Sequence, residues 1–211
     1  MEKQIIQKLF KQINKKHIIS IIYYGNNKGK DIDLCVIVNT SMTYDKIEKN
    51  NMDLTIFNEK YFIYLAQLLD PLTTEPILTG KEIYGNRLKY YSNIIKNVKP
   101  SVDTIKHLYD FSIQIFIAGK NLYYKNKYQS SMENLYFSLS YIAYANYYSY
   151  ANKVILFKEL MNINHDSILS EVKYYVKQKN KLNKDKINYF INTTNELIKI
   201  CKNNFHLLYY K

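Results

Sequence analysis

The sequence predicts an α+β fold, in which a small mixed sheet with flanking helices is followed by an all-α helical bundle. Short β-branched and aromatic runs, typical of buried strands, are confined to the first 60 residues. From about Glu59 onward, apolar residues instead recur at helical spacing almost to the end. Only 5 Gly and 3 Pro occur in 211 residues, so turns are few and segments long. We therefore expect a mixed domain at 1–85 and a helical bundle at 86–211.

The expected elements follow from these patterns. In the first domain we expect an amphipathic helix over 3–16, strands at 18–24, 31–38 and 52–57, a short helix around 41–45, and a helix over 59–69. Asn58 can cap that last helix. The Pro and Gly residues of 71–85 predict an irregular linker. The bundle is predicted to contain long helices at 101–126, 129–151, 165–181 and 184–209, the first starting at Ser101.

The charge and cysteine content restrict the protein class. The formal net charge is +12, but Arg87 is the only arginine, and the abundance of Lys, Asn, Ile and Tyr is typical of an AT-rich genome. The positive field would still attract an anionic substrate such as a nucleoside triphosphate. Cys35 and Cys201 fit neither a disulfide scaffold nor a zinc site. There is no signal-peptide pattern and no run of about 18 apolar residues, so we expect a cytoplasmic protein without a membrane partner.

The segment from Gly25 to Asp33 has the residue types of a metal and phosphate site. A predicted strand stops at Gly25, a turn-forming stretch follows, and the chain returns to the sheet at Asp31-Ile32-Asp33. Because alternate residues of a strand share a face, Asp31 and Asp33 should project together while Ile32 points into the core. Two adjacent carboxylates repel each other unless a cation lies between them. Mg²⁺ suits this position because it also accepts phosphate oxygens.

A third carboxylate, Asp53, begins the next predicted strand. If that strand lies beside 31–38, Asp53 can reach the same cluster, and three carboxylates can hold two Mg²⁺ ions. The turn can bind a triphosphate through backbone N–H groups and side-chain donors. The candidate triphosphate-binding residues are Gly25, Asn26, Lys28 and Lys30.

These residues resemble the DNA polymerase beta-like nucleotidyltransferase superfamily. Its pattern of an apolar residue before Gly-Ser, a variable loop, Asp-x-Asp and a later Asp on a neighbouring strand matches three segments here, Tyr24-Gly25-Asn26, Asp31-Ile32-Asp33-Leu34 and Asp53-Leu54. The segment from Pro76 to Tyr84 also looks like the one that leaves the catalytic domain in many members. Minimal and antibiotic nucleotidyltransferases within this superfamily have a similar size and a C-terminal helical domain. The resemblance covers about the first 85 residues and implies a nucleotidyltransferase-type sheet.

The resemblance implies an Mg²⁺-dependent enzyme that transfers a nucleoside monophosphate, with AMP from ATP as first choice, to a hydroxyl group. By this resemblance Asp31, Asp33 and Asp53 are the catalytic metal ligands. An aminoglycoside-like small molecule is the first candidate acceptor, and tRNA or a protein partner, as in toxin–antitoxin systems, is the alternative. A helical-domain carboxylate acts as general base in the antibiotic enzymes, and Glu133 is one candidate for this role. A homodimer could complete the site.

Two departures from the family pattern leave other functions open. Asn26 replaces the family's serine, and the loop before Asp31 is shorter than usual. A catalytically degenerate nucleotide-binding module is therefore an alternative. A basic, helical nucleic-acid-binding protein is another, although the tyrosines of 129–151 surround their predicted helix and indicate core positions more than a stacking platform.

Overall fold

The computed structural model describes residues 9–10, 13–24, 32–41, 44–49, 52–163, 167–178 and 182–209. At 44, 46–49, 52 and 204–209 it describes the backbone alone. The chain divides into two compact units, Met1–Lys99 and Pro100–Lys211. This division lies later than the predicted boundary near residue 85, because the helix at 88–97 packs on the first unit.

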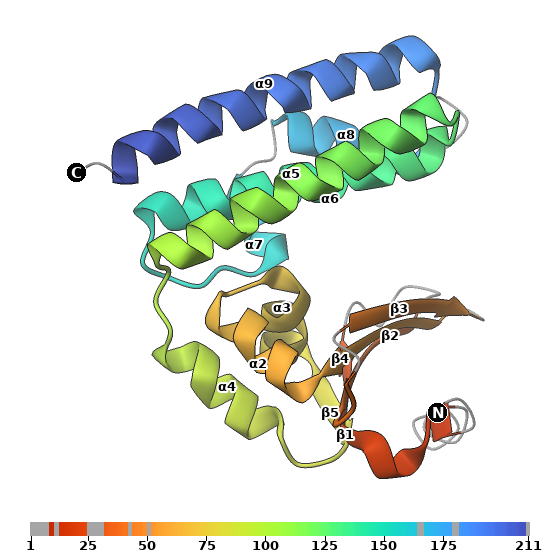
Figure 1. The fold of residues 1–211 in the computed structure, drawn as a ribbon, viewed down its shortest axis with the longest axis vertical. Coiled ribbons are helices and arrows are strands. Elements are labelled where there is room, and N and C mark those ends of the chain that lie inside the picture. The colour runs from red at the N-terminus through yellow and green to blue at the C-terminus, as the bar shows by residue number, and fades with distance from the viewer. Residues whose placement is uncertain are drawn as a thin grey trace. The chain divides into compact units, whose positions relative to one another are not determined.

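The first unit contains a five-stranded sheet in the order β3-β4-β2-β1-β5, shown in Figure 1. Its strands are β1 (Ile18–Tyr24), β2 (Ile32–Val38), β3 (Tyr44–Lys49), β4 (Met52–Asn58) and β5 (Lys81–Tyr84). Its helices are the 3₁₀ turn η1 (Lys15–His17), α2 (Glu59–Gln67), α3 (Pro71–Thr79) and α4 (Leu88–Asn97). β2 and β4 are parallel, while the other neighbouring pairs are antiparallel. The α+β fold class and the three predicted strands are confirmed.

Two sequence predictions in this unit are wrong. The segment expected to form a short helix is the strand β3, a charged edge strand whose backbone pairs with β4. Charged residues are common on edge strands, so its sequence lacks the apolar alternation that would have revealed it. The expected linker instead holds α3 and β5. Pro71 sits in the first turn of α3, where proline is tolerated, and Asp70 caps that helix by accepting from Leu72 N at 2.8 Å.

Both faces of the sheet are covered. One face packs on the chain's N-terminal segment through a buried cluster that comprises Leu9, Ile18, Ile21, Leu34, Val36, Val38, Leu54 and Ile56. On the other face lie α2 and α3 (Figure 1), and the Phe57 ring of β4 contacts the Phe62 ring of α2 at 5.4 Å. Cys35 is fully buried. Burial raises the pKa of its thiol.

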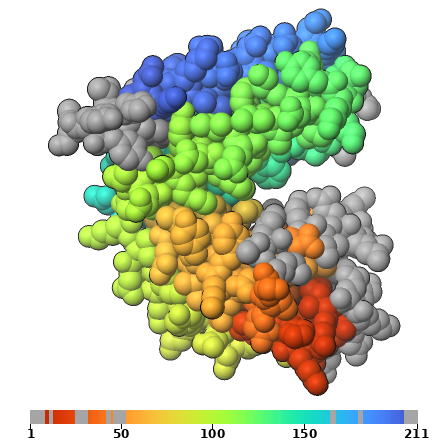
Figure 2. All heavy atoms as spheres, viewed as in Figure 1, coloured from red at the N-terminus to blue at the C-terminus, as the bar shows by residue number. Residues whose placement is uncertain are grey.

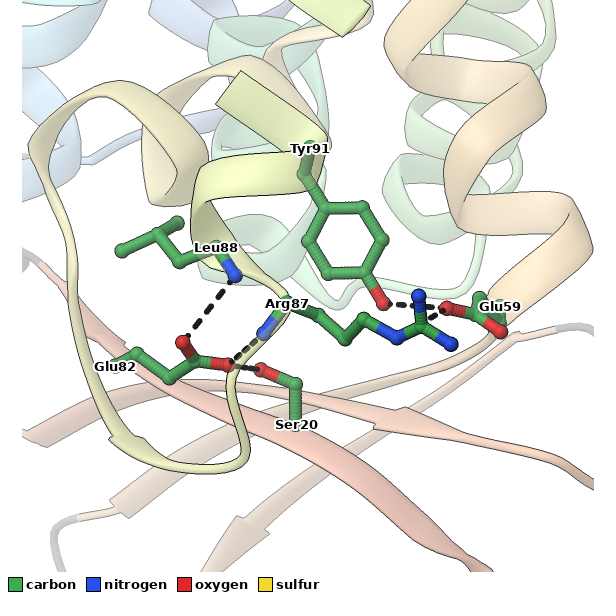
Figure 3. Close-up of polar contacts among 6 residues, drawn as sticks. All are labelled: Ser20, Glu59, Glu82, Arg87, Leu88 and Tyr91. Atoms are coloured by element: carbon green, nitrogen blue, oxygen red, sulfur yellow. Dashed lines mark hydrogen bonds and ion pairs between the residues drawn. The ribbon is translucent and has the colours of Figure 1, made fainter. Parts of the chain in front are cut away.

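Glu82 of β5 fixes the start of α4, as Figure 3 shows. Its Oε1 accepts from Ser20 Oγ at 2.6 Å and from Arg87 N at 2.8 Å, and its Oε2 accepts from Leu88 N at 3.2 Å. A carboxylate at the positive end of a helix satisfies backbone N–H groups that have no partner within the helix. Glu82 therefore anchors α4 to the sheet.

Tyr91 and Glu59 join α4 to α2 (Figure 3). The Tyr91 ring is fully buried against Phe62, and its hydroxyl donates to Glu59 Oε1 at 2.8 Å. Arg87 Nε lies 3.8 Å from the same Glu59 oxygen. Burial and then the hydrogen bond to Glu59 raise the pKa of Tyr91. These contacts hold α2 and α4 together at the carboxyl end of β4.

The second unit is helical. It contains α5 (Val102–Tyr124), α6 (Tyr128–Tyr150), α7 (Phe157–Ile163), α8 (Ile168–Lys177) and α9 (Lys184–Tyr209). The helices predicted over 101–126, 129–151 and 184–209 are confirmed, and Ser101 caps α5 by accepting from Thr104 N. α8 is shorter than the helix predicted over 165–181, and α7 was not predicted. In Figure 2, α9 in blue packs along α5 in green. None of the described helices is long and apolar enough to cross a membrane.

The α5–α6 pair is packed closely through small residues. A Cβ added at Gly119 would lie 3.2 Å from the Cβ of Asn134 and 3.4 Å from the Ser131 carbonyl oxygen. Ser131 Oγ donates to the Gly119 carbonyl oxygen at 2.9 Å, and Ser138 Oγ donates to the Ser112 carbonyl oxygen at the same distance. α5 and α6 approach closely because Gly119 has no side chain. The buried serine hydroxyls then hydrogen-bond from one helix to the other.

Candidate active site

Asp33 and Asp53 stand side by side in the sheet. In the parallel β2–β4 pair, Asp33 is the register partner of Asp53. The same row extends to Tyr24 on β1, opposite Asp33, and to Glu48 on β3, opposite Asp53. Residues directly opposite on neighbouring strands project to one face, so the Asp33 and Asp53 carboxyl groups share a face.

This face is the one that α2 covers, and the cover stops short of the two carboxylates. Alternation along β2 and β4 puts Asp33 on the side of Cys35 and Asp53 on the side of Thr55 and Phe57. Cys35, Thr55 and Phe57 are buried, whereas Asp33 and Asp53 are partly exposed. The carboxylates therefore lie at the rim of a buried surface, where an ion or a phosphate can reach them.

The donor set at this rim fits a hard divalent cation. Two carboxylates in register supply the oxygen ligands that Mg²⁺ prefers, and their mutual repulsion is relieved when a cation lies between them. Within the described residues, no group of three or more His, Cys, Asp or Glu side chains is placed to hold a metal ion. Asp31, the predicted third ligand, lies outside the described residues.

The predicted triphosphate-binding residues, Gly25, Asn26, Lys28 and Lys30, also lie outside the described residues. Their segment joins Tyr24 to Ile32, and Tyr24 is the register partner of Asp33. The chain therefore leaves β1 and enters β2 at the same end of these strands at which the two carboxylates lie. Their phosphate-binding role stays a prediction.

Glu133 lies on α6 in the second unit. Its Oε1 accepts from Gln129 Nε2 at 2.7 Å, and the same nitrogen lies 3.2 Å from the Val176 carbonyl oxygen of α8. This contact gives Glu133 a part in joining α6 to α8. Its role as general base stays a prediction.

Sequence reasoning missed Glu48. Its register position opposite Asp53 puts a third acidic residue in the row. The segment 44–49 was expected to be partly helical, and a helix would not have aligned Glu48 with Asp53. The signal that could have found it is the separation of Lys46 and Glu48 by two residues, which is the period of a strand.

A pocket of about 270 Å³ lies in the second unit among α6, α8 and α9. Its lining is mainly aliphatic and includes Leu139, Ile142, Ala143, Leu169, Leu197 and Ile200. Cys201 also lines it, and burial raises the pKa of that thiol. The pocket thus offers apolar contact but no carboxylate or cation for acid–base chemistry.

Comparisons with known proteins give little further guidance. No protein-family model matches the chain, and no curated protein matches it. Among solved structures, the chain is similar to a nucleotidyltransferase-like protein from Exiguobacterium sibiricum 255-15, with 14% identity and a TM-score of 0.41, over 97% of this chain and 78% of that chain. A likeness of this degree carries no function over to this chain.

Proposed function

We propose that this chain is an Mg²⁺-dependent nucleotidyltransferase that transfers a nucleoside monophosphate from a nucleoside triphosphate to a hydroxyl group. The observation that carries the proposal is the register of Asp33 with Asp53 on adjacent parallel strands. This register puts the two acids that the sequence motif singles out on one face of the sheet. The motif alone could not establish that the two strands are neighbours.

Asp33 and Asp53, together with Asp31, would hold the Mg²⁺. The cation would neutralise triphosphate charge and favour attack by the acceptor oxygen. In the transfer, the acceptor oxygen forms a bond to the α-phosphorus, the bond from that phosphorus to the pyrophosphate breaks, and the hydroxyl proton passes to a base. The segment 25–30 would bind the triphosphate, and Glu133 is the candidate base.

AMP from ATP is the first choice of transferred group, and a small hydroxyl-bearing molecule is the first choice of acceptor. Asp33 and Asp53 are partly exposed, so a ligand can approach them from solvent. The positive net charge of +12 favours association with an anionic nucleotide.

The activity test uses the full chain with each nucleoside triphosphate, Mg²⁺ and a panel of hydroxyl acceptors, and measures pyrophosphate release. Asp33→Asn and Asp53→Asn should each lower the rate by at least about 100-fold, since even groups that only support a metal ligand contribute 10–100-fold. Glu133→Gln should lower the rate, because Glu133 is the candidate general base.

The matched control is Asp45→Asn. Asp45 is an exposed acid of the same sheet, and its register partner is Ile56, whose side chain belongs to the opposite, buried face. This variant should keep the wild-type rate. Pyrophosphate release that survives in both Asp33→Asn and Asp53→Asn would refute the proposal.

A second readout does not need the acceptor. Mg²⁺ at ten times its dissociation constant stabilises a folded protein by about 1.4 kcal/mol. For a chain of this length this corresponds to an increase in Tm of roughly 3–6 °C. The wild type and Asp45→Asn should show this increase, and Asp33→Asn should not. An equal increase in all three proteins would show that the ion binds elsewhere.

A further inference from the structure

The turn between α5 and α6 carries a cluster of three aromatic rings. We call residues 120–128 the α5–α6 tip. The Tyr123 ring is buried, and its centroid lies 5.6 Å from that of Tyr124 and 5.9 Å from that of Tyr128. Tyr124, the last residue of α5, is nevertheless 71% exposed. The buried ring of Tyr123 therefore supports a tyrosine that is itself mostly open to solvent.

The backbone of the tip is fixed by hydrogen bonds. Asn126 has a φ of 56°, in the left-handed region that Asn tolerates better than most residues. Lys127 N donates to the Leu122 carbonyl oxygen at 2.9 Å, which closes the end of α5. The Tyr128 hydroxyl donates to Asn126 Oδ1 at 2.9 Å. Tyr124 is thus presented on a defined turn, and little conformational entropy is lost when a ligand binds there.

The tip is positively charged. It contains Lys120, Lys125 and Lys127, and the last two of these are exposed. The sequence has no Asp or Glu between Asp110 and Glu133. The charge of the three lysines is therefore not balanced by an acid of the same segment, and it is complementary to phosphate groups.

Lys120 lies on the same face of α5 as Tyr124. The two residues are four positions apart in the helix, so the Tyr124 side chain lies over the turn that contains Lys120. The Lys120 Nζ lies 5.7 Å from the ring centroid of Phe116, one turn further back. Along the chain, the exposed ring is therefore flanked by Lys120 on one side and by Lys125 on the other.

The polar surroundings of Tyr124 favour a nucleotide over a membrane. The other exposed residues of the tip are Asn121, Lys125, Asn126 and Lys127. A segment that binds a bilayer places apolar side chains below the lipid headgroups, and none of these four residues has one. A flat base with attached phosphates matches a single exposed ring among lysines.

From these observations we infer that the α5–α6 tip binds single-stranded nucleic acid. One base stacks on the Tyr124 ring, and the phosphates beside it pair with Lys125 and Lys127. A duplex covers the faces of its bases, so the ring distinguishes a single strand from a duplex. RNA and DNA share the stacking and the charge on which this binding depends, so both are tested. The binding concerns the second unit alone and is independent of the proposed nucleotidyl transfer.

Binding is measured by fluorescence anisotropy with the full chain and a fluorescein-labelled, unstructured 12-nucleotide RNA, without nucleoside triphosphate or Mg²⁺, and again with DNA of the same sequence. Tyr124→Leu keeps apolar bulk but removes the aromatic face. It should raise the Kd by at least about fivefold, the contribution of one stacked base. The matched control is Tyr150→Leu, which removes a 68% exposed ring from the last residue of α6 and should keep the wild-type Kd.

Two comparisons isolate the role of the ring. Tyr124→Phe should bind the single strand like the wild type, because phenylalanine stacks on a base as tyrosine does. A duplex of the same sequence should bind the wild type and Tyr124→Leu equally, because its base faces are covered. A lower Kd for RNA or for DNA identifies which single strand the tip prefers.

The charge contribution is read from the salt dependence. Lys125→Gln and Lys127→Gln should each reduce the slope of log Kd against log salt concentration by about 0.7. The control Lys153→Gln removes an exposed lysine three residues after the end of α6, and it should keep the slope.

Three outcomes would overturn the inference. They are a wild type that binds neither single strand, a Tyr124→Leu variant that binds as tightly as the wild type, and tip lysine variants that keep the wild-type slope. A wild type that binds phosphatidylserine vesicles but neither strand would assign the tip to a membrane instead. Circular dichroism and Tm confirm that each variant is folded, and the lysine variants provide the test if Tyr124→Leu unfolds. Asp33→Asn should bind the single strand like the wild type, so the failure of nucleotidyl transfer and the failure of this binding are separate results.

Discussion

At the scale of single residues, the carboxylates of the first unit have two kinds of environment. Glu82 and Glu59 are enclosed by donors, namely Ser20 Oγ, two backbone N–H groups and the Tyr91 hydroxyl. Asp33 and Asp53 instead are register partners on neighbouring strands, and both are partly exposed. The first arrangement stabilises the fold, whereas the second favours a cation.

Tyr91 provides a test of the first arrangement. Its raised pKa means that above about pH 10 the unfolded chain loses the hydroxyl proton while the folded protein keeps it. The free energy of unfolding is therefore lowered as pH rises above 10, by up to about 1.4 kcal/mol per pH unit from this group. Tyr91→Phe should be less stable than the wild type at pH 7 by about 1.5–3 kcal/mol, the cost of losing a hydrogen bond to a charged group. It should also lose less stability between pH 10 and 11.

Urea unfolding at a series of pH values measures both effects. The matched control is Tyr64→Phe, which removes a hydroxyl from a 53% exposed ring on α2. Equal losses of stability above pH 10 in Tyr91→Phe and the wild type would contradict the assignment.

At the scale of elements, the two units use different means to bring their segments together. The sheet aligns residues that are far apart in sequence through backbone register, which is how Asp53 comes to lie beside Asp33. The α5–α6 pair instead depends on small residues, because helices approach closely only where side chains are short. Gly119 and the buried serines provide that closeness.

Gly119→Val should therefore destabilise the protein. The larger side chain would meet Asn134 and the Ser131 carbonyl oxygen, and overpacking of this kind costs roughly 1–3 kcal/mol. Gly119→Ala should be close to neutral, because the gain of about 1 kcal/mol in helix propensity offsets its tight contact. The control Ala118→Val places the same side chain on the exposed face of α5 and should cost about 0.6 kcal/mol. Thermal unfolding measures all three, and similar Tm values for Gly119→Val and Ala118→Val would contradict the close approach.

At the scale of the whole molecule, the chain consists of two units with separate cores. The second unit buries its own residues, which include Leu108, Phe116, Leu135, Leu139, Val172, Ile187, Phe190 and Ile191. It has more than 100 residues, which is enough for an independent core.

We expect the fragment 100–211 to fold by itself. Its far-ultraviolet circular dichroism should be helical, and its thermal unfolding should be cooperative. Gly119→Val should lower the Tm of the fragment, as in the full chain. A fragment that melts without a cooperative transition would show that the second unit depends on residues before Pro100.

The sequence determined much of the fold. Helices with a clear apolar period, such as α5, α6 and α9, were predicted close to their observed bounds. A long run of apolar residues at helical spacing can bury its apolar face only as a helix. α4 and α7 were not predicted, and β3, α3 and β5 were missed. β3 depends on its pairing with β4. α3 forms with Pro71 in its first turn, where proline is tolerated, and holds Pro76 in its interior as well. In each case a partner or a position decides the structure, and a local pattern does not contain that information.

The candidate site divides in the same way. The sequence by itself identified Asp33 and Asp53, because the spacing of acids after strand patterns is a local property. Only the tertiary structure decided that their strands are parallel neighbours in register, and that Glu48 stands in the same row. The physical reason is that the sequence specifies the type of each side chain directly, whereas the proximity of two side chains results from strand pairing and helix packing between distant segments.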